Sequence, residues 1–150
     1  MDNATTSNID TIAKTCIAVR LRLLNRVVTN VYDDALRPLG LKASQLNLLI
    51  VTAWLGLARP AQVCDILQLD ASTLSRNVKP LQAHGWVEVV PGEDARAQPF
   101  RLTPKGKRLI EKAVPAWEEA QRRASELLGN EGISLLDKAA RKVGMSQAGH

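Results

Sequence analysis

The chain has 150 residues, of which 45% are apolar, and its 20 Lys and Arg outnumber its 15 Asp and Glu to give a formal net charge of +5. This length is typical of one domain, and the apolar fraction is too high for a disordered chain. The aromatic residues are three Trp, one Tyr and one Phe, too few for the stacking platforms of single-stranded nucleic-acid modules.

Neither the cysteines nor the hydropathy indicates a metal centre, a secreted protein or a membrane protein. Cys16 and Cys64 are too few and too far apart for a zinc site or a disulfide framework. The first ten residues are polar, and no uncharged apolar stretch approaches the roughly 20 residues that span a bilayer. We therefore expect a cytoplasmic protein with no membrane partner, no metal and no cofactor.

The first expected element is a long helix over residues 9–36, where apolar residues recur at spacings of three and four. Such a helix is roughly 40 Å long, which is more than a small domain needs. Part of its apolar face is therefore expected to contact something outside the domain. Residues 37–40, Arg-Pro-Leu-Gly, end the helix.

Two shorter helices come next. Ser44 is expected to open a helix over residues 45–57, whose middle is apolar on nearly all sides and therefore indicates a central, buried helix. Pro60 suits the first turn of a short helix that runs to Leu67, because its missing N–H is no loss there.

The fourth expected helix has two distinct faces. Asp70 is a good N-cap for a helix that runs to residue 84, and Gly85 ends it. The face expected to point inward consists of Ala71, Leu74, Val78 and Leu81. The opposite face carries small hydroxyls and two cations, Ser72, Thr73, Ser75, Arg76 and Lys79.

After Gly85 the pattern predicts a β-hairpin, with strands over residues 86–90 and 98–102 and a charged turn between them. Thr103 then caps a helix expected to run to about residue 128, with a bend at Pro115. Gly129 interrupts this helix, and residues 133–143 form the last one. Residues 1–7 and 144–150 are expected to be flexible tails.

Three helices followed by a two-stranded hairpin are the order of a winged helix-turn-helix domain, here over residues 37–103. The fold class is therefore mainly α with a small antiparallel hairpin. A helix whose outer face carries short hydroxyls and long cations fits a DNA major groove, where Arg76 can pair with guanine and Lys79 can contact phosphate. Residues 8–36 and 104–143 are expected to form a helical dimerisation region, with exposed apolar residues at Ile9, Ile12, Leu127, Leu128, Leu135 and Leu136.

The sequence resembles the multiple-antibiotic-resistance regulator (MarR) family of bacterial transcription factors. The resemblance is carried by the run Asp70-Ala71-Ser72-Thr73-Leu74-Ser75-Arg76 and by the wing signature, Asp94-Ala95-Arg96 followed after five residues by Leu102-Thr103-Pro104-Lys105-Gly106. It spans roughly residues 10–143. Two features depart from the family: Pro80 lies inside the recognition helix, and Glu93 and Asp94 make the wing tip less basic.

The resemblance implies a homodimeric repressor that binds double-stranded DNA at a pseudo-palindromic operator and that a small aromatic or phenolic ligand releases. Arg96 is then expected to reach the minor groove from the wing, with Asp94 holding it in place. The expected DNA-contacting residues are Ser72, Thr73, Ser75, Arg76, Asn77, Lys79, Arg96 and Gln98.

Three alternatives remain open from the sequence. In the first, Cys16 is a redox-sensing thiol, although it lies on the apolar stripe of the first helix, where burial raises a thiol pKa. In the second, the winged helix binds a protein partner. In the third, which concerns a single residue, Trp54 lines a ligand cavity instead of simply filling the core. The sequence contains no enzyme motif, and we therefore expect that the protein is not an enzyme.

Overall fold

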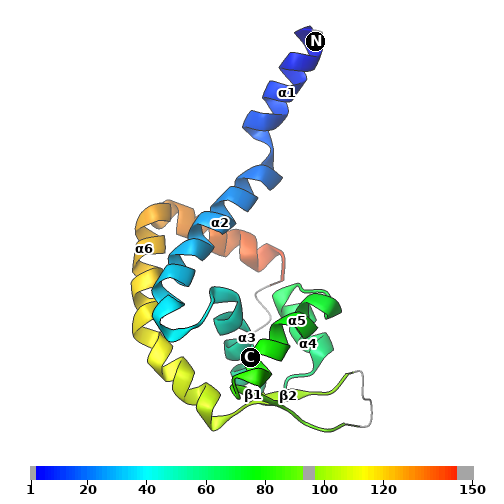
Figure 1. The fold of residues 1–150 in the computed structure, drawn as a ribbon. Helices are drawn as coiled ribbons and strands as arrows, with labels where there is room; N and C mark the ends of the chain where they lie inside the picture. The colour runs from blue at the N-terminus through cyan, green and yellow to red at the C-terminus, as the bar shows by residue number, and fades with distance from the viewer. Residues whose placement is uncertain (1–2, 93–96, 145–150) are drawn as a thin grey trace.

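The computed structural model of the chain describes residues 3–92 and 97–144, and it confirms the mainly helical fold with one antiparallel hairpin (Figure 1). In chain order the elements are α1 (Asn3–Thr15), α2 (Ile17–Leu36), the 3₁₀ turn η1 (Arg37–Leu39), α3 (Ala43–Leu55), α4 (Pro60–Leu67), α5 (Ala71–Ala83), β1 (Val87–Val89), β2 (Phe100–Leu102) and α6 (Pro104–Lys142). Within the described ranges, no helix is long and apolar enough to cross a membrane.

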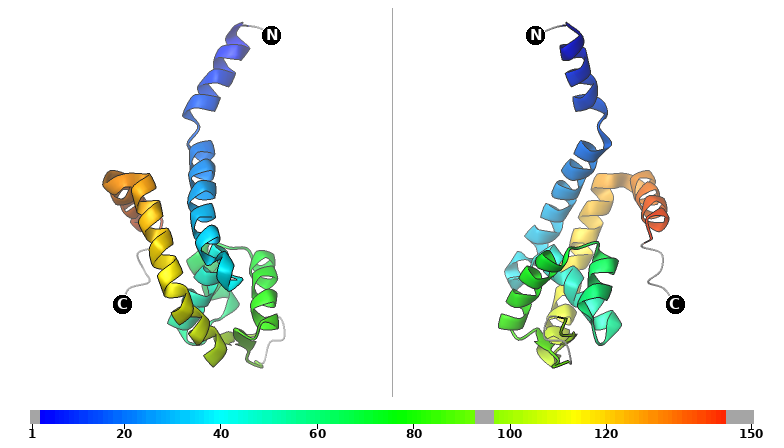
Figure 2. Two further views of the ribbon diagram at one scale, coloured as in Figure 1. Left: turned by 60° about the vertical axis from the view of Figure 1, so that its left-hand side comes forward. Right: turned by 90° about the vertical axis from the view of Figure 1, so that its right-hand side faces the viewer.

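The single long helix predicted over residues 9–36 is wrong in two respects: the chain breaks at Cys16, and the helical structure begins within the predicted flexible tail of residues 1–7. The backbone of Cys16 is extended (φ −62°, ψ 114°), so that α1 and α2 are separate helices, and α1 begins at Asn3. The guanidinium of Arg20 donates to the carbonyl of Lys14, one of the acceptors left free at the end of α1. Helix α1 projects away from the rest of the molecule (Figures 1 and 2), so tertiary packing does not hold the two helices in line.

Helix α3 is the centre of the core. Leu46, Leu48, Leu49 and Thr52 are buried, and the hydroxyl of Thr52 donates to the carbonyl of Leu48. The helix begins two residues before the predicted start, because the Asp33 carboxylate accepts a hydrogen bond from the backbone N–H of Ala43 (2.7 Å). This cap comes from α2, ten residues away, which local sequence patterns do not reveal.

The predicted helix-turn-helix is confirmed. Helix α4 has Pro60 at its first turn and ends at Gln68, whose left-handed backbone (φ 51°) turns the chain towards α5. The N-cap of α5 is Asp70, and Gly85 (φ 70°) follows its end. Leu74 and Leu81 anchor α5 in the core, where they are at most 3% exposed.

The hairpin is confirmed, and its strands are shorter than predicted. Val87 pairs with Leu102, and Val89 with Phe100. Phe100 also exchanges two backbone hydrogen bonds with Ala58, of 2.8 and 2.9 Å, so the loop between α3 and α4 continues the sheet. These two bonds between Ala58 and Phe100 fix the base of the wing against the helices.

Helix α6 runs along α2 and then turns sharply (Figure 2). The turn is at Gly129, whose backbone angles (φ 68°, ψ 166°) interrupt the helix as predicted. The helix resumes directly after Gly129, earlier than the predicted residue 133. At Pro115 the backbone stays helical. Pro115 and Glu111 are both exposed, so solvent can satisfy the carbonyl that the proline leaves without a partner.

Candidate nucleic-acid interface

Helix α5 presents a polar face to solvent, as predicted. Ser72, Ser75, Arg76 and Lys79 are exposed, while Thr73 and Asn77 are half-buried. Leu74 and Leu81 hold the opposite side in the core. One prediction is wrong: Ala71 is exposed instead of facing inward, because it is the first residue of the helix, before the point where α5 reaches the core.

The start of α5 is organised by the carboxylate of Asp70. Its Oδ1 accepts from the backbone N–H of Thr73 (2.7 Å) and from the hydroxyl of Ser72 (2.7 Å). Its Oδ2 accepts from the hydroxyl of Thr73 (3.0 Å). These three donors hold the pKa of Asp70 at about 2, the backbone N–H of Thr73 contributing most. The carboxylate is therefore ionised at neutral pH, and its stabilising effect is lost only as the pH falls from 3.8 through about 2.

The hydrogen bonds around Asp70 extend to Arg76, a cation on the exposed face of α5. The Nη2 of Arg76 donates to the hydroxyl oxygen of Thr73 (3.3 Å) one turn earlier. The sequence predicts that Thr73 is one of the DNA-contacting residues. In the structure its hydroxyl has a partner on both sides, Asp70 and Arg76. The pairing of an Asp N-cap with a Thr three positions later is a sequence signal from which this could have been inferred.

Pro80 lies in the last turn of α5 without ending it. The helix continues to Ala83, and the carbonyl of Pro80 accepts from the backbone N–H of His84 (3.0 Å). The bond that Pro80 removes is the one to the carbonyl of Arg76, which lies on the exposed face.

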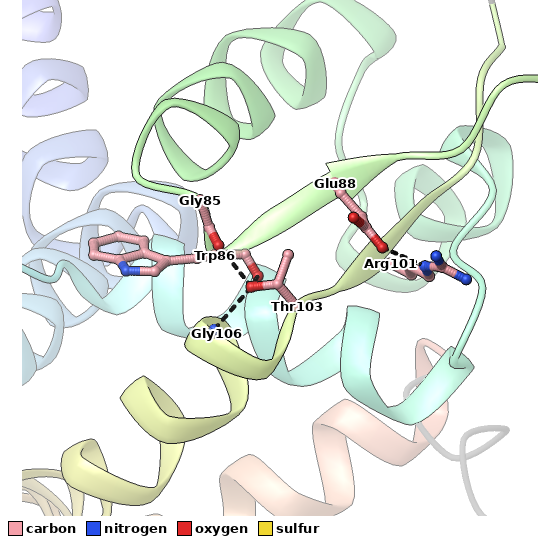
Figure 3. A network of polar contacts seen from close by, with 6 residues as sticks. All are labelled: Gly85, Trp86, Glu88, Arg101, Thr103 and Gly106. Atoms are coloured by element: carbon pink, nitrogen blue, oxygen red, sulfur yellow. Dashed lines mark hydrogen bonds and ion pairs between the residues drawn. The ribbon is translucent and has the colours of Figure 1, made fainter.

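The wing is braced by a cross-strand ion pair, which sequence analysis did not identify. Glu88 on β1 faces Arg101 on β2, and the Oε1 of Glu88 lies 2.6 Å from the Nε of Arg101 (Figure 3). Among the predicted wing residues, Gln98 is half-buried. Asp94 and Arg96 lie outside the described residues, so their roles stay predictions.

The joint between wing and α6 explains the sequence Leu102-Thr103-Pro104-Lys105-Gly106. The Thr103 hydroxyl donates to the carbonyl of Gly85 (2.6 Å) and accepts from the N–H of Gly106 (3.0 Å), as Figure 3 shows. Gly106 lies so close to β1 that a Cβ there would meet the carbonyl oxygen of Trp86 at 2.2 Å. This part of the signature is therefore structural: it fixes where the hairpin leaves the end of α5.

Cys16, Trp54 and His84 lie outside the exposed polar face of α5. Cys16 is half-buried at the junction of α1 and α2, and its reactivity stays a prediction. Trp54 is 52% exposed and so does not fill the core. His84 stacks on Trp86 with ring centroids 4.2 Å apart. No cluster of three His, Cys, Asp or Glu suited to a metal occurs in residues 3–92 and 97–144.

A surface groove of about 480 Å³ lies between α3, β2 and α6. Its lining includes aliphatic and charged side chains, and its residues are Ala53, Gly56, Arg101, Leu102, Lys107, Ile110 and Glu111. The sequence pattern does not predict this groove, because its walls come from three separate elements. Trp54 is not part of its lining, so the predicted cavity role of that residue finds no support in it.

Comparison with known proteins identifies relatives of this chain. Residues 39–97 match the model of the MarR family. The uncharacterized HTH-type transcriptional regulator YwoH of Bacillus subtilis is 29% identical over 86 residues, which cover 57% of this chain and 63% of YwoH, just under two thirds of that protein. The multiple antibiotic resistance protein MarR of Salmonella typhimurium is 25% identical over 124 residues, covering 81% of this chain and 85% of that protein.

Solved structures share the fold. A mutant MarR from E. coli in complex with operator DNA superposes with a TM-score of 0.77 at 20% identity, covering 89% of this chain and 97% of that one. BpsR of Bordetella bronchiseptica, described for the regulation of its DNA binding by 6-hydroxynicotinic acid, superposes with a TM-score of 0.73 at 21% identity, covering 84% and 91%. The family match over residues 39–97, the relatives and the shared winged-helix fold support assignment of the chain to the MarR family of transcriptional regulators.

Proposed function

We propose that the chain is a homodimeric transcriptional regulator that binds a pseudo-palindromic operator in double-stranded DNA and that a small aromatic ligand releases. The observation that carries the proposal is the solvent-facing surface of α5, where Ser72, Ser75, Arg76 and Lys79 are all exposed beside the wing. Helices of this kind enter the major groove, and symmetric dimers place two of them one helical turn apart.

The side chains of α5 suit the chemistry of that groove. The guanidinium of Arg76 presents a fork of donors that matches O6 and N7 of guanine. Lys79, one turn later on the same face, is at a position for phosphate contact. Asp70 is acidic, but it lies at the very start of the helix, where its carboxylate accepts three hydrogen bonds from the protein itself.

The dimer is supported by large apolar side chains that one copy leaves uncovered. Helices α1, α2 and α6 expose Ile9, Ile12, Leu23, Leu127, Leu135 and Leu136, each at least 41% accessible. Of the six residues predicted for the interface, only Leu128 is half-buried within the chain itself. Single apolar residues are common on surfaces, whereas a set that extends over three helices is typical of an obligate interface.

For the dimer, we expect purified protein to sediment with twice the 16.4 kDa mass of the chain. Leu135→Glu is expected to weaken association by at least about 100-fold, because two leucines per dimer lose their burial and two charges are placed in an apolar interface. Ser134→Glu adds the same charge to the neighbouring exposed position and is expected to leave the dimer intact. A monomeric wild type would refute the dimer, and a Leu135→Glu variant that remains dimeric would place Leu135 outside the interface.

Selection of bound sequences from a random duplex library tests the DNA proposal directly. We expect the wild type to select a site with two inverted half-sites whose centres are separated by about one turn of B-form DNA. Binding to a random duplex is expected to be weaker and to depend steeply on salt. A library without enrichment, together with binding to an acidic protein surface, would instead favour the protein-interaction alternative.

The ligand proposal is supported by the regulation named for BpsR and by the size of the groove between α3, β2 and α6. Ligand pockets for small molecules begin at about 300 Å³, so a groove of about 480 Å³ accommodates a single aromatic ring. We expect 6-hydroxynicotinic acid at millimolar concentration to lower operator affinity. Arg101→Ala, which removes a groove cation, is expected to abolish that effect, whereas a variant that still responds would place the ligand elsewhere.

A further inference from the structure

The hydrogen-bonding direction of two hydroxyls at the start of α5 is fixed by the structure. An ionised carboxylate can only accept, so the hydroxyl protons of Ser72 and Thr73 both point to Asp70, across distances of 2.7 and 3.0 Å. A hydroxyl has one proton and two lone pairs. Once its proton is donated to Asp70, each hydroxyl offers only acceptor capacity to any other group.

The two hydroxyls differ in what they can still do. Thr73 is half-buried, and its oxygen already accepts from Nη2 of Arg76 (3.3 Å). Ser72 is exposed on the polar face of α5, one position after the first residue of the helix. Residues near the start of a recognition helix are the ones that reach base edges. Ser72 is therefore the hydroxyl with a lone pair directed at DNA, and Thr73 is a positioning residue for Arg76.

We propose that Ser72 is a specificity-determining residue that accepts a hydrogen bond from the exocyclic amino group of an adenine or a cytosine, with Asp70 fixing the direction of its hydroxyl. This inference rests on the proposed DNA binding by α5. In the major groove only adenine N6 and cytosine N4 are donors, whereas guanine and thymine present acceptors at the same edge. Phosphate oxygens are also acceptors, so the network excludes Ser72 from phosphate contact.

The selection arises because the Ser72 hydroxyl cannot turn without loss. To donate to a thymine or guanine it would have to break its hydrogen bond to a charged carboxylate, and charge-assisted bonds are about twice as strong as neutral ones. With the proton held, an acceptor on the base would face the lone pair of Ser72 without a bridging proton. The wrong base therefore leaves both groups unsatisfied, which gives discrimination at that base pair.

The experiment measures whether the Ser72 hydroxyl and a single exocyclic amino group contribute jointly to affinity. It uses the operator selected by the wild type. Each adenine is replaced in turn by purine, and each cytosine by 2-pyrimidinone, so that only the exocyclic amino group is lost. At one base pair of each half-site, we expect this loss to reduce wild-type affinity by about fivefold to tenfold. At the same base pair, it should reduce the affinity of Ser72→Ala by less than about twofold, because the hydroxyl that used the amino group is already absent.

Three variants separate this role from a general weakening of the helix. Ser75→Ala removes a hydroxyl from the same face and is expected to leave the coupling between Ser72 and its base unchanged. Asp70→Asn keeps a good helix cap but puts an amide donor next to the hydroxyl of Thr73. We expect it to reduce the preference for guanine opposite Arg76 without reducing binding to a random duplex. Asp65→Asn removes the same charge from exposed α4 and should leave that preference unchanged.

The outcomes distinguish this inference from the function on which it rests. Suppose that the wild type selects an operator but Ser72→Ala reduces the effect of no amino-group removal, or instead reduces the effect of removing guanine N7 with 7-deazaguanine. Either result overturns this inference and leaves the DNA-binding function standing. If the wild type selects no operator, the proposed function fails and this inference fails with it.

Discussion

Arg76→Ala is expected to lower affinity for the selected operator by about 1–3 kcal/mol per half-site and to relax the base preference opposite that residue. The guanidinium is exposed, and a hydrogen bond to Thr73 holds it towards the start of α5. Because a forked contact reads one base pair, removing it should affect the specific site much more than a random duplex. Titrations of both duplexes with the purified variant measure the difference.

Arg141→Ala is the matched control for the loss of charge. Arg141 is paired with Asp137 near the end of α6, far along the chain from α5, and we expect its removal to leave operator preference unchanged. Arg96→Ala is a second comparison. We expect it to lower affinity and to reduce the dependence of affinity on salt concentration by about one ion, with little change in major-groove base preference. Undiminished affinity and preference in Arg76→Ala would remove that residue from the interface.

Gly106→Ala is expected to destabilise the fold by about 3 kcal/mol and to lower Tm by about 10 °C. The added methyl group would lie 2.2 Å from the carbonyl oxygen of Trp86 and 2.8 Å from Cδ1 of Leu102. The first contact is with backbone, which cannot move aside as the end of a flexible side chain can. Either the first turn of α6 or the start of β1 must shift, and the bonds of Thr103 to Gly85 and Gly106 weaken with it.

Gly132→Ala provides the control in the same helix. A Cβ at Gly132 would meet only Cβ of Leu128, at an ordinary distance of 3.4 Å. Alanine is a better helix former than glycine, so this variant should be as stable as the wild type or more stable by up to about 1 kcal/mol. Thermal unfolding followed by circular dichroism compares the two. Equal Tm values for both variants would show that the joint between the wing and α6 tolerates a side chain.

The recognition unit could be predicted from the sequence because its determinants are local. Apolar residues at helical spacing, Pro60 at a first turn, Asp70 as a cap and Gly85 after the helix end each act within a few residues. The interruption of α6 at Gly129 is a property of a single residue in the same sense. These signals agree with one another along residues 60–102, which is why the elements there were placed nearly correctly.

The roles of the site residues were predicted less completely. The helical pattern predicts which face of α5 is exposed, but it treats the hydroxyls of Ser72, Thr73 and Ser75 as equivalent. In the structure the first two donate to Asp70, and Thr73 also accepts from Arg76. Side-chain hydrogen bonds depend on rotamers and on distances of a few tenths of an ångström, which a spacing pattern does not contain.

By itself, the sequence determined the order of the helices and strands, the cap and polar face of α5, and the resemblance to the MarR family. Contacts between distant segments were decided only by the tertiary structure: Asp33 caps α3, Arg101 pairs with Glu88, and Gly106 lies against Trp86. The break at Cys16 belongs with them, because the pattern shows that a segment favours helix but not whether packing keeps two helices in line. Periodicity specifies which face is apolar, whereas these contacts depend on where separate elements meet in space.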